Sequence, residues 1–233
     1  QIEMGARDII MVIDSGGGEA YGCFATAASL RKMADDNDVQ LVAYVDGYAC
    51  SAAYALASAA HEIVANPQAT VGSVGVVVQL MNNNEALKKA GYSRTFVYAG
   101  DSKIPFDKEG EFDKEFISKI QGSINKTYRR FTNLVATNRG LQEADVVNTQ
   151  ASVYDADEAL TIGFVDKLME TEDFFENYVP SLRQTTNNST KMETEENMTL
   201  EELQAMKAKA QAAGHNVIEL NAETESVISL SDL

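Results

Sequence analysis

Ser51 is the residue of this sequence best placed to act as a nucleophile. It stands in "VDGYACSAAYALASAA" (45–60), where an apolar, strand-like run passes into a segment rich in alanine. A serine at the start of a helix can be an N-cap, whose hydroxyl accepts a bond from a free amide of the first turn. The same position can hold a nucleophile, because the next amide can stabilise an oxyanion. The segment alone leaves both interpretations open.

A nucleophilic serine needs a base, and the sequence offers few candidates. His61 and His215 are the only histidines, and His61 follows Ser51 closely, across the helix expected between them. A lysine can replace histidine if burial lowers its pKa enough to leave the amine neutral near pH 7. Lys103 lies in "YAGDSKIPFDKEG" (98–110), a loop expected directly after a strand. Taken alone, that lysine is more simply explained as a solvated surface residue.

A glycine-rich junction, "IDSGGGEA" (13–20), precedes the serine segment. Glycine can adopt a positive φ and permits close approach, so the amides of such a loop can converge on an anion or oxyanion. A tight turn would also need glycine. The segment lacks the Lys-Ser/Thr pair of a phosphate loop and the spacing of a dinucleotide fingerprint.

Alternating β and α patterns must position these residues. Strands are predicted at 8–14, 39–47, 61–67, 71–81 and 93–100, and helices at 20–34, 51–60, 83–91, 113–138, 142–149 and 155–163. Strands that are apolar throughout and alternate with helices are typical of a covered, largely parallel sheet. The predicted fold class is therefore α/β.

Composition excludes several other functions. The net charge of −16 argues against nucleic acid as a partner, because phosphate binding needs clustered lysine and arginine. No apolar stretch reaches the roughly 18 residues of a membrane helix, and a total of two histidines argues against a metal site built on imidazoles. Cys23 and Cys50 have no metal-ligand spacing, which favours buried free thiols over a disulfide.

Charge and composition also divide the chain. We expect a main domain at 1–178, a polar linker at 179–198 and an acidic, flexible tail at 199–233 that is partly helical. The first residue is Gln1 rather than Met, so we expect the main domain to lack some upstream sequence.

Four segments occur in a fixed order: "SGGG" after an apolar strand, "DGYACSAAYALASAA", "ATVGSVGVV" and the lysine loop. Together they resemble the signal peptide peptidase A family of the Clp-protease/crotonase superfamily, over about residues 7–169. The resemblance implies a spiral of ββα units and a serine endopeptidase that needs no metal or cofactor. It implies that Ser51 is the nucleophile and Lys103 the general base of a Ser-Lys dyad. It further implies that Gly17 and Ala52 supply the oxyanion-hole amides and that Ser73 orients the lysine.

Within that family, "VATNRGLQEADV", "VYDADEALTIGFVDKL" and the acidic linker before "MTLEELQAM" are most similar to tailed-phage head maturation proteases. This similarity implies that the substrates are capsid or scaffold polypeptides and the chain itself, in an assembling procapsid in the host cytoplasm. It also implies a homo-oligomeric ring or dome, in which Lys103 of one subunit can reach Ser51 of the next. Gly16 departs from the family pattern, which has proline there.

Three alternatives remain open from the sequence. A membrane-associated bacterial signal peptide peptidase would share the same dyad. A crotonase-type acyl-thioester enzyme would share the fold and the oxyanion hole, but this acidic chain has no evident basic patch for the phosphates of coenzyme A. A non-catalytic scaffold protein could keep the fold without the chemistry.

Overall fold

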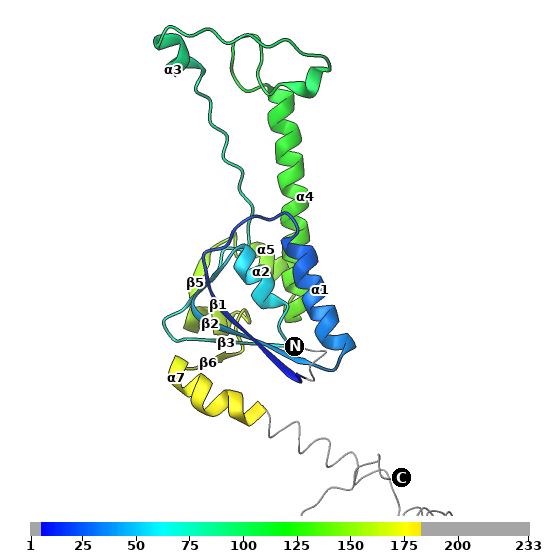
Figure 1. Cartoon of the computed structure of the whole chain (residues 1–233), viewed down its shortest axis with the longest axis vertical. Helices are drawn as coiled ribbons and strands as arrows, with labels where there is room; N and C mark the ends of the chain where they lie inside the picture. Colours follow the sequence, from blue (N-terminus) through cyan, green and yellow to red (C-terminus); the bar gives the residue numbers. More distant parts are fainter. Residues whose placement is uncertain (1–5, 183–233) are drawn as a thin grey trace, which may run out of the picture. The chain divides into compact units, whose positions relative to one another are not determined.

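The computed structural model describes residues 6–182 (Figure 1). The chain divides into two compact units, Gln1–Asn177 and Tyr178–Leu233. The fold described below is that of the first unit. From residue 183 onward, the predicted linker and the whole of the acidic tail lie outside the described residues. Those domain boundaries therefore stay a prediction.

A largely parallel sheet forms the centre of the first unit. Within the described residues its strands are β1 (Asp8–Ser15), β2 (Gln40–Cys50), β3 (Glu62–Ala65), β4 (Thr70–Gly72), β5 (Val153–Asp155) and β6 (Lys167–Leu168). The long β2 pairs in parallel with β1, β3 and β4, and β6 pairs in parallel with β3. β5 runs antiparallel to β4. The α/β prediction is confirmed.

The six helices predicted from the sequence are present, with ends that differ by at most three residues. The described residues form α1 (Cys23–Asp36), α2 (Ala52–Ser58), α3 (Asn84–Lys89), η2 (Asp101–Lys103), α4 (Lys114–Arg139), α5 (Glu143–Asn148), α6 (Ala156–Thr161), α7 (Thr171–Asp173) and η3 (Phe174–Tyr178). Of these, η2, α7 and η3 lie where the pattern predicts no helix. The long α4 has a defined start, because the Asp113 carboxylate accepts bonds from the amides of Glu115 and Phe116 at 2.8 and 3.0 Å. It ends at Gly140, whose φ of 65° is left-handed.

The alanine-rich α2 is buried on almost every side. It contacts α1, α4, β1 and β2, and Tyr54, Ala55 and Ala57 are fully buried. Small side chains let these elements approach the helix closely, which explains the alanines. The one large side chain, that of Tyr54, stacks on Phe164 and donates a hydrogen bond from its hydroxyl to the Phe164 carbonyl at 2.9 Å.

Two strands predicted from the sequence, at 71–81 and 93–100, are wrong for most of their length. β4 ends at Gly72, and residues 73–81 and 93–100 form no strand. Among the described residues no strand pairs with them, and a strand needs a partner for its N–H and C=O groups. The sequence missed β5 and β6, which are only three and two residues long.

We predict that Ala55→Leu lowers the free energy of unfolding by about 1–3 kcal/mol, because extra methyl groups must displace packed neighbours. The matched control is Ala25→Leu on the exposed side of α1, which should change stability by less than about 0.5 kcal/mol. Urea denaturation of both variants checks this. Equal effects would contradict the close packing around α2.

Candidate active site

The backbone at Ser51 is held in an unusual conformation. Ser51 joins β2 to α2 with φ 54° and ψ −123°, and its hydroxyl makes no capping bond. Its amide donates to the Gly72 carbonyl at 2.9 Å, which fixes the turn against the end of β4. A residue other than glycine in such a region costs about 1–3 kcal/mol. The N-cap interpretation is therefore wrong, and within residues 6–182 no hydrogen bond occupies the Ser51 hydroxyl.

Gly17 lies directly against this turn. Its φ is 112°, and a Cβ placed on it would lie 2.7 Å from Ser51 Cβ and 3.2 Å from the Ala52 nitrogen. Only glycine fits both the conformation and the space. The Ala52 amide is the first of α2, so it has no acceptor within the helix. The Gly17 amide donates to Ser15 Oγ at 3.2 Å, a long bond that another acceptor can replace.

A largely apolar cavity of about 590 Å³ opens beside Ser51. Ser51, Ala52 and Ser73 line it together. Ser73 also has a positive φ, of 54°, and its amide donates to the Ser152 carbonyl at 2.8 Å. The apolar wall consists of Tyr21, Phe24, Val76, Val77, Val78, Ile120, Ile124 and Phe131. The fold thus brings Gly17, Ser51, Ala52 and Ser73 to one place.

Sequence reasoning missed part of this wall. The later part of α4 packs into the core, where Phe131 is only 1% exposed. Ile120 and Ile124, nearer the start of the helix, line the Ser51 cavity instead. The signal was available in the length of the stripe, because α4 has 26 residues and only its later part is buried.

Lys103 does not join this group within one chain. It is exposed at the end of η2, and among the described residues no lysine or histidine lines the Ser51 cavity. It belongs to residues 77–113, which we call the extension. Figure 1 shows the extension, from α3 onward, beyond the N-terminal end of α4 and away from the sheet.

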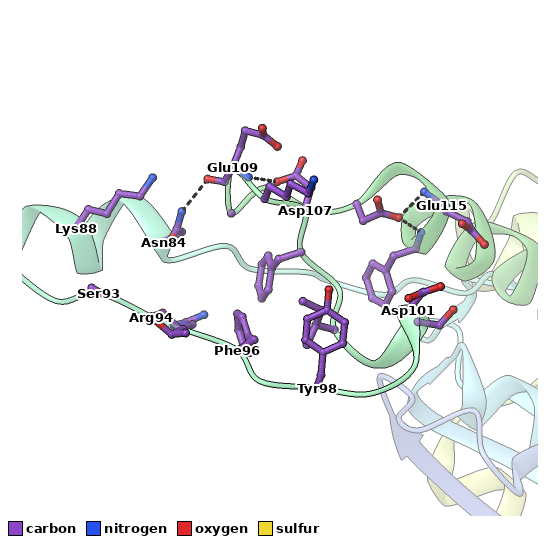
Figure 2. Close-up of a pocket in the computed structure, with 18 of the residues that line it drawn as sticks. Asn84, Lys88, Ser93, Arg94, Phe96, Tyr98, Asp101, Asp107, Glu109 and Glu115 are labelled. Atoms are coloured by element: carbon purple, nitrogen blue, oxygen red, sulfur yellow. Dashed lines mark hydrogen bonds between the residues drawn. The ribbon is translucent and has the colours of Figure 1, made fainter.

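The extension has an aromatic cluster of its own. Phe96, Phe106, Phe112 and Phe116 stack in sequence, with ring centroids 5.1 to 6.1 Å apart. The Arg94 guanidinium lies 6.0 Å from two of these rings (Figure 2). The cluster joins the extension to Phe116 in the first turn of α4, and so holds the segment around Lys103 near the start of that helix.

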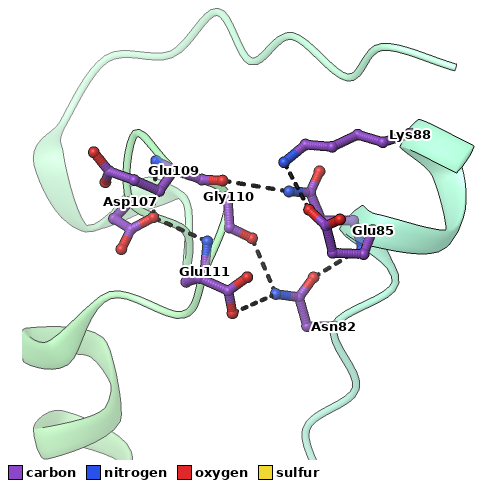
Figure 3. A network of polar contacts seen from close by, with 8 residues as sticks. Asn82, Glu85, Lys88, Asp107, Glu109, Gly110 and Glu111 are labelled. Carbon is purple, nitrogen blue, oxygen red and sulfur yellow. Dashed lines mark hydrogen bonds and ion pairs between the residues drawn. The ribbon is translucent and has the colours of Figure 1, made fainter.

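Polar contacts close the other end of the extension. Asn82 Nδ2 donates to the Gly110 carbonyl at 3.0 Å and to Glu111 Oε2 at 3.2 Å (Figure 3). Asp107 Oδ1 accepts from the amides of Glu109 and Glu111, which holds the turn between them. The two chain segments that lead into and out of the extension are therefore tied together.

His61 has a structural role. Its Nδ1 accepts from the Leu41 amide at 2.9 Å, and its Nε2 lies 2.8 Å from Asp35 Oδ1. The bond from His61, together with the charge of Arg31, lowers the pKa of the Asp35 carboxyl. Both ring nitrogens are occupied, so His61 is no base for Ser51.

The two cysteines near Ser51 are unsuited to act as nucleophiles. Both are free, as predicted, and the Cys23 thiol donates to the Ala52 carbonyl at 3.4 Å. Burial raises the pKa of Cys23 and of Cys50, so both thiols stay protonated at neutral pH. Within residues 6–182 no cluster of three metal-ligating side chains occurs, and no helix is long and apolar enough to span a membrane.

Comparison with known sequences decides the family. The sequence model of peptidase family S49 matches residues 33–185, more than half of the chain. The chain belongs to peptidase family S49. The matched range of this S49 chain contains Ser51, Ala52, Ser73 and Lys103, whereas Gly17 precedes it.

Two relatives show how the S49 chain compares with longer proteins. Capsid assembly protease C of Escherichia phage lambda is 30% identical over 165 residues, which are 71% of this chain and 37% of the relative. Probable protease SohB of Haemophilus influenzae is 28% identical over 166 residues, 71% of this chain and 46% of the relative. The chain thus spans less than half of the length of either relative.

Among solved structures, a mutant of ClpP1 from Listeria monocytogenes matches with a TM-score of 0.46 and 16% identity. The match covers 73% of this chain and 79% of that chain. The assignment of the fold class rests on the sheet topology described above.

We predict that Ser51→Gly raises the free energy of unfolding by about 1 kcal/mol, because glycine relieves the strained φ at a smaller cost in unfolded-chain entropy. The control is Asp113→Ala, which removes an actual helix cap and should cost about 1 kcal/mol. Urea denaturation measures both. A loss of stability in Ser51→Gly would contradict the strain.

We also predict that Gly17→Ala slows phosphonylation of Ser51 by a fluorophosphonate at least about 100-fold, because an added Cβ displaces the amides that bind the oxyanion. Gly16→Ala is the control, since a Cβ there meets nothing within 4 Å. Labelling rates followed by intact mass check the pair. Equal rates for both variants would exclude Gly17 from the site.

Proposed function

We propose that this chain is a serine endopeptidase and that Ser51 is its nucleophile. The observation that carries the proposal is the Ser51 turn, with its positive φ, its uncapped hydroxyl and the cavity beside it. Costly backbone conformations cluster at reacting groups, where the surrounding structure holds them in place. Burial raises the pKa of the neighbouring thiols, those of Cys23 and Cys50, and so disfavours their reactive thiolate form. The serine hydroxyl is then the candidate nucleophile.

Peptide hydrolysis would proceed in two halves. Ser51 Oγ bonds to the carbonyl carbon while its proton passes to the neutral amine of Lys103, which then protonates the leaving amine. The amides of Gly17 and Ala52 bind the oxyanion, and each such donor is worth about 3 kcal/mol. The Gly17 amide exchanges its bond to Ser15 Oγ for the oxyanion. Water then cleaves the acyl-enzyme by the same route.

Lys103 acts from a neighbouring copy of the chain in this proposal. No lysine or histidine lines the Ser51 cavity among the described residues of one chain, and Lys103 is exposed in the extension. A second copy that places its extension over this cavity would bury the lysine amine, and burial is what makes a lysine a base at neutral pH. Ser73, on the cavity wall, would orient that amine by a hydrogen bond.

The surface of the extension supports an assembly of copies. Val77, Met81 and Val97 are 87%, 77% and 97% exposed. The surrounding segments, 73–81 and 93–100, have the sequence of strands but no strand partner within residues 6–182. Unpaired extended segments with apolar side chains readily add to a neighbouring chain. We propose that neighbouring copies meet there, in a ring or dome.

The proposed substrates are capsid or scaffold polypeptides, including the chain itself, in a phage procapsid that assembles in the host cytoplasm. The name of the phage lambda relative supports this choice. The apolar cavity supports an extended substrate with an apolar side chain next to the scissile bond.

A subunit-mixing experiment tests the shared site. Ser51→Ala and Lys103→Ala chains should each be inactive on fluorescein-labelled casein. Chains co-expressed in equal amounts should recover about a quarter of wild-type activity, because about one head-to-tail interface in four then joins an intact Ser51 to an intact Lys103.

The control for this experiment is Lys108→Ala, which changes an exposed lysine of the same extension and should keep wild-type activity. A mixture as inactive as its parents would contradict a site shared between copies. Full activity in Ser51→Ala would instead favour a non-catalytic scaffold with a contaminating protease.

A further inference from the structure

The pairing between β1 and β2 changes register beside the glycine loop. Ile13 pairs with Val45, but the next pair is Ser15 with Ala49. The chain advances by two residues on β1 and by four on β2. A bulge at Asp46–Tyr48 takes up the difference, and a bulge changes the direction of the chain that follows it.

The Asp14 carboxylate holds this bulge in place. Asp14 stands alone opposite the bulge, and its Oδ1 accepts a hydrogen bond from the Tyr48 amide at 2.9 Å. A Cβ placed on Gly47 would lie 2.6 Å from the same oxygen. Because the carboxylate lies directly on the Gly47 backbone, only glycine leaves room for it.

The two residues joined by this hydrogen bond, Asp14 and Tyr48, each lead along the chain to the proposed oxyanion site. On β1, Asp14 is followed by Ser15, whose hydroxyl accepts from the Gly17 amide at 3.2 Å. On β2, Tyr48 begins the run that ends at Ser51. A shift of the bulge would therefore move Gly17 relative to Ser51, and the space between these two residues is too small for even one added Cβ.

We infer that Asp14 is a positioning residue for Ser51 chemistry, and that it acts by fixing the register between the Gly17 loop and the Ser51 turn. This inference rests on the proposed function. The property that matters is a hydrogen-bond acceptor of the right length, so asparagine should replace aspartate. Misplacement of reacting groups by about 1 Å can cost about 100-fold in rate.

Phosphonylation kinetics with a fluorophosphonate test the inference, because they separate binding of the probe from the chemical step. Asp14→Ala should lower the maximal rate about 100-fold with little change in the half-saturating probe concentration. Asp14→Asn should react within about twofold of wild type, since its Oδ1 still accepts from the Tyr48 amide. Asp8→Ala, on the same strand, is the control and should match wild type.

Gly47→Ala should reproduce the defect of Asp14→Ala, and the double variant should be no slower than either single one, because both changes remove one contact. Hydrogen exchange at the Tyr48 amide should be slow in wild type and Asp14→Asn and fast in Asp14→Ala. Asparagine as defective as alanine, or additive effects in the double variant, would overturn the inference. If wild type itself were not labelled at Ser51 although the Tyr48 amide exchanged as expected, the proposed function would fall and the catalytic role of Asp14 with it.

Discussion

The turn that joins β2 to α2 is the constraint on which the site depends. Ser51 takes a positive φ there, and the turn is held from two sides. The Gly72 carbonyl accepts the Ser51 amide at the end of β4, and Gly17 contacts the turn from the end of β1. Because the three strands are neighbours in one sheet, their carboxyl ends meet at the same edge, where α/β folds place ligand sites.

The helix that follows this turn serves the same purpose. Its alanines let α1, α4 and the sheet pack closely around it, so the strain at Ser51 is opposed by a tightly packed core. A hydrogen bond of 3.1 Å from Asn138 Nδ2 to the buried Ser58 hydroxyl further connects the end of α2 to α4. A rigid helix keeps its first amide, that of Ala52, at a fixed distance from Ser51.

The sequence predicted most of this arrangement, and the two wrongly predicted strands share one physical cause. Buried strands and helices with a continuous pattern, such as 39–47 and 113–138, correspond to β2 and α4. The resemblance to the signal peptide peptidase A family predicted that four residues share one site. The fold places these four together: Gly17, Ser51, Ala52 and Ser73. The strands expected at 71–81 and 93–100 are not formed, because pairing depends on a neighbour that sequence pattern cannot supply.

Other features could not be read from the sequence at all. The contact between Asp14 and Gly47 depends on a register change between two strands, and the residues are 33 positions apart. Whether the Ser51 hydroxyl caps α2 depends on the backbone dihedral angles at that residue. In the proposed assembly, Lys103 reaches the Ser51 cavity only through contacts between copies of the chain, and this arrangement stays a prediction.

Mapping the site of fluorophosphonate attachment tests the central claim most directly. The full chain is labelled, digested and mapped by tandem mass spectrometry, with Ser51→Ala treated in parallel. The account predicts a single phosphonyl adduct on Ser51 in the wild type and none in the variant. An adduct on another residue, or wild-type chain that assembles but stays unlabelled, would contradict a nucleophilic role for Ser51.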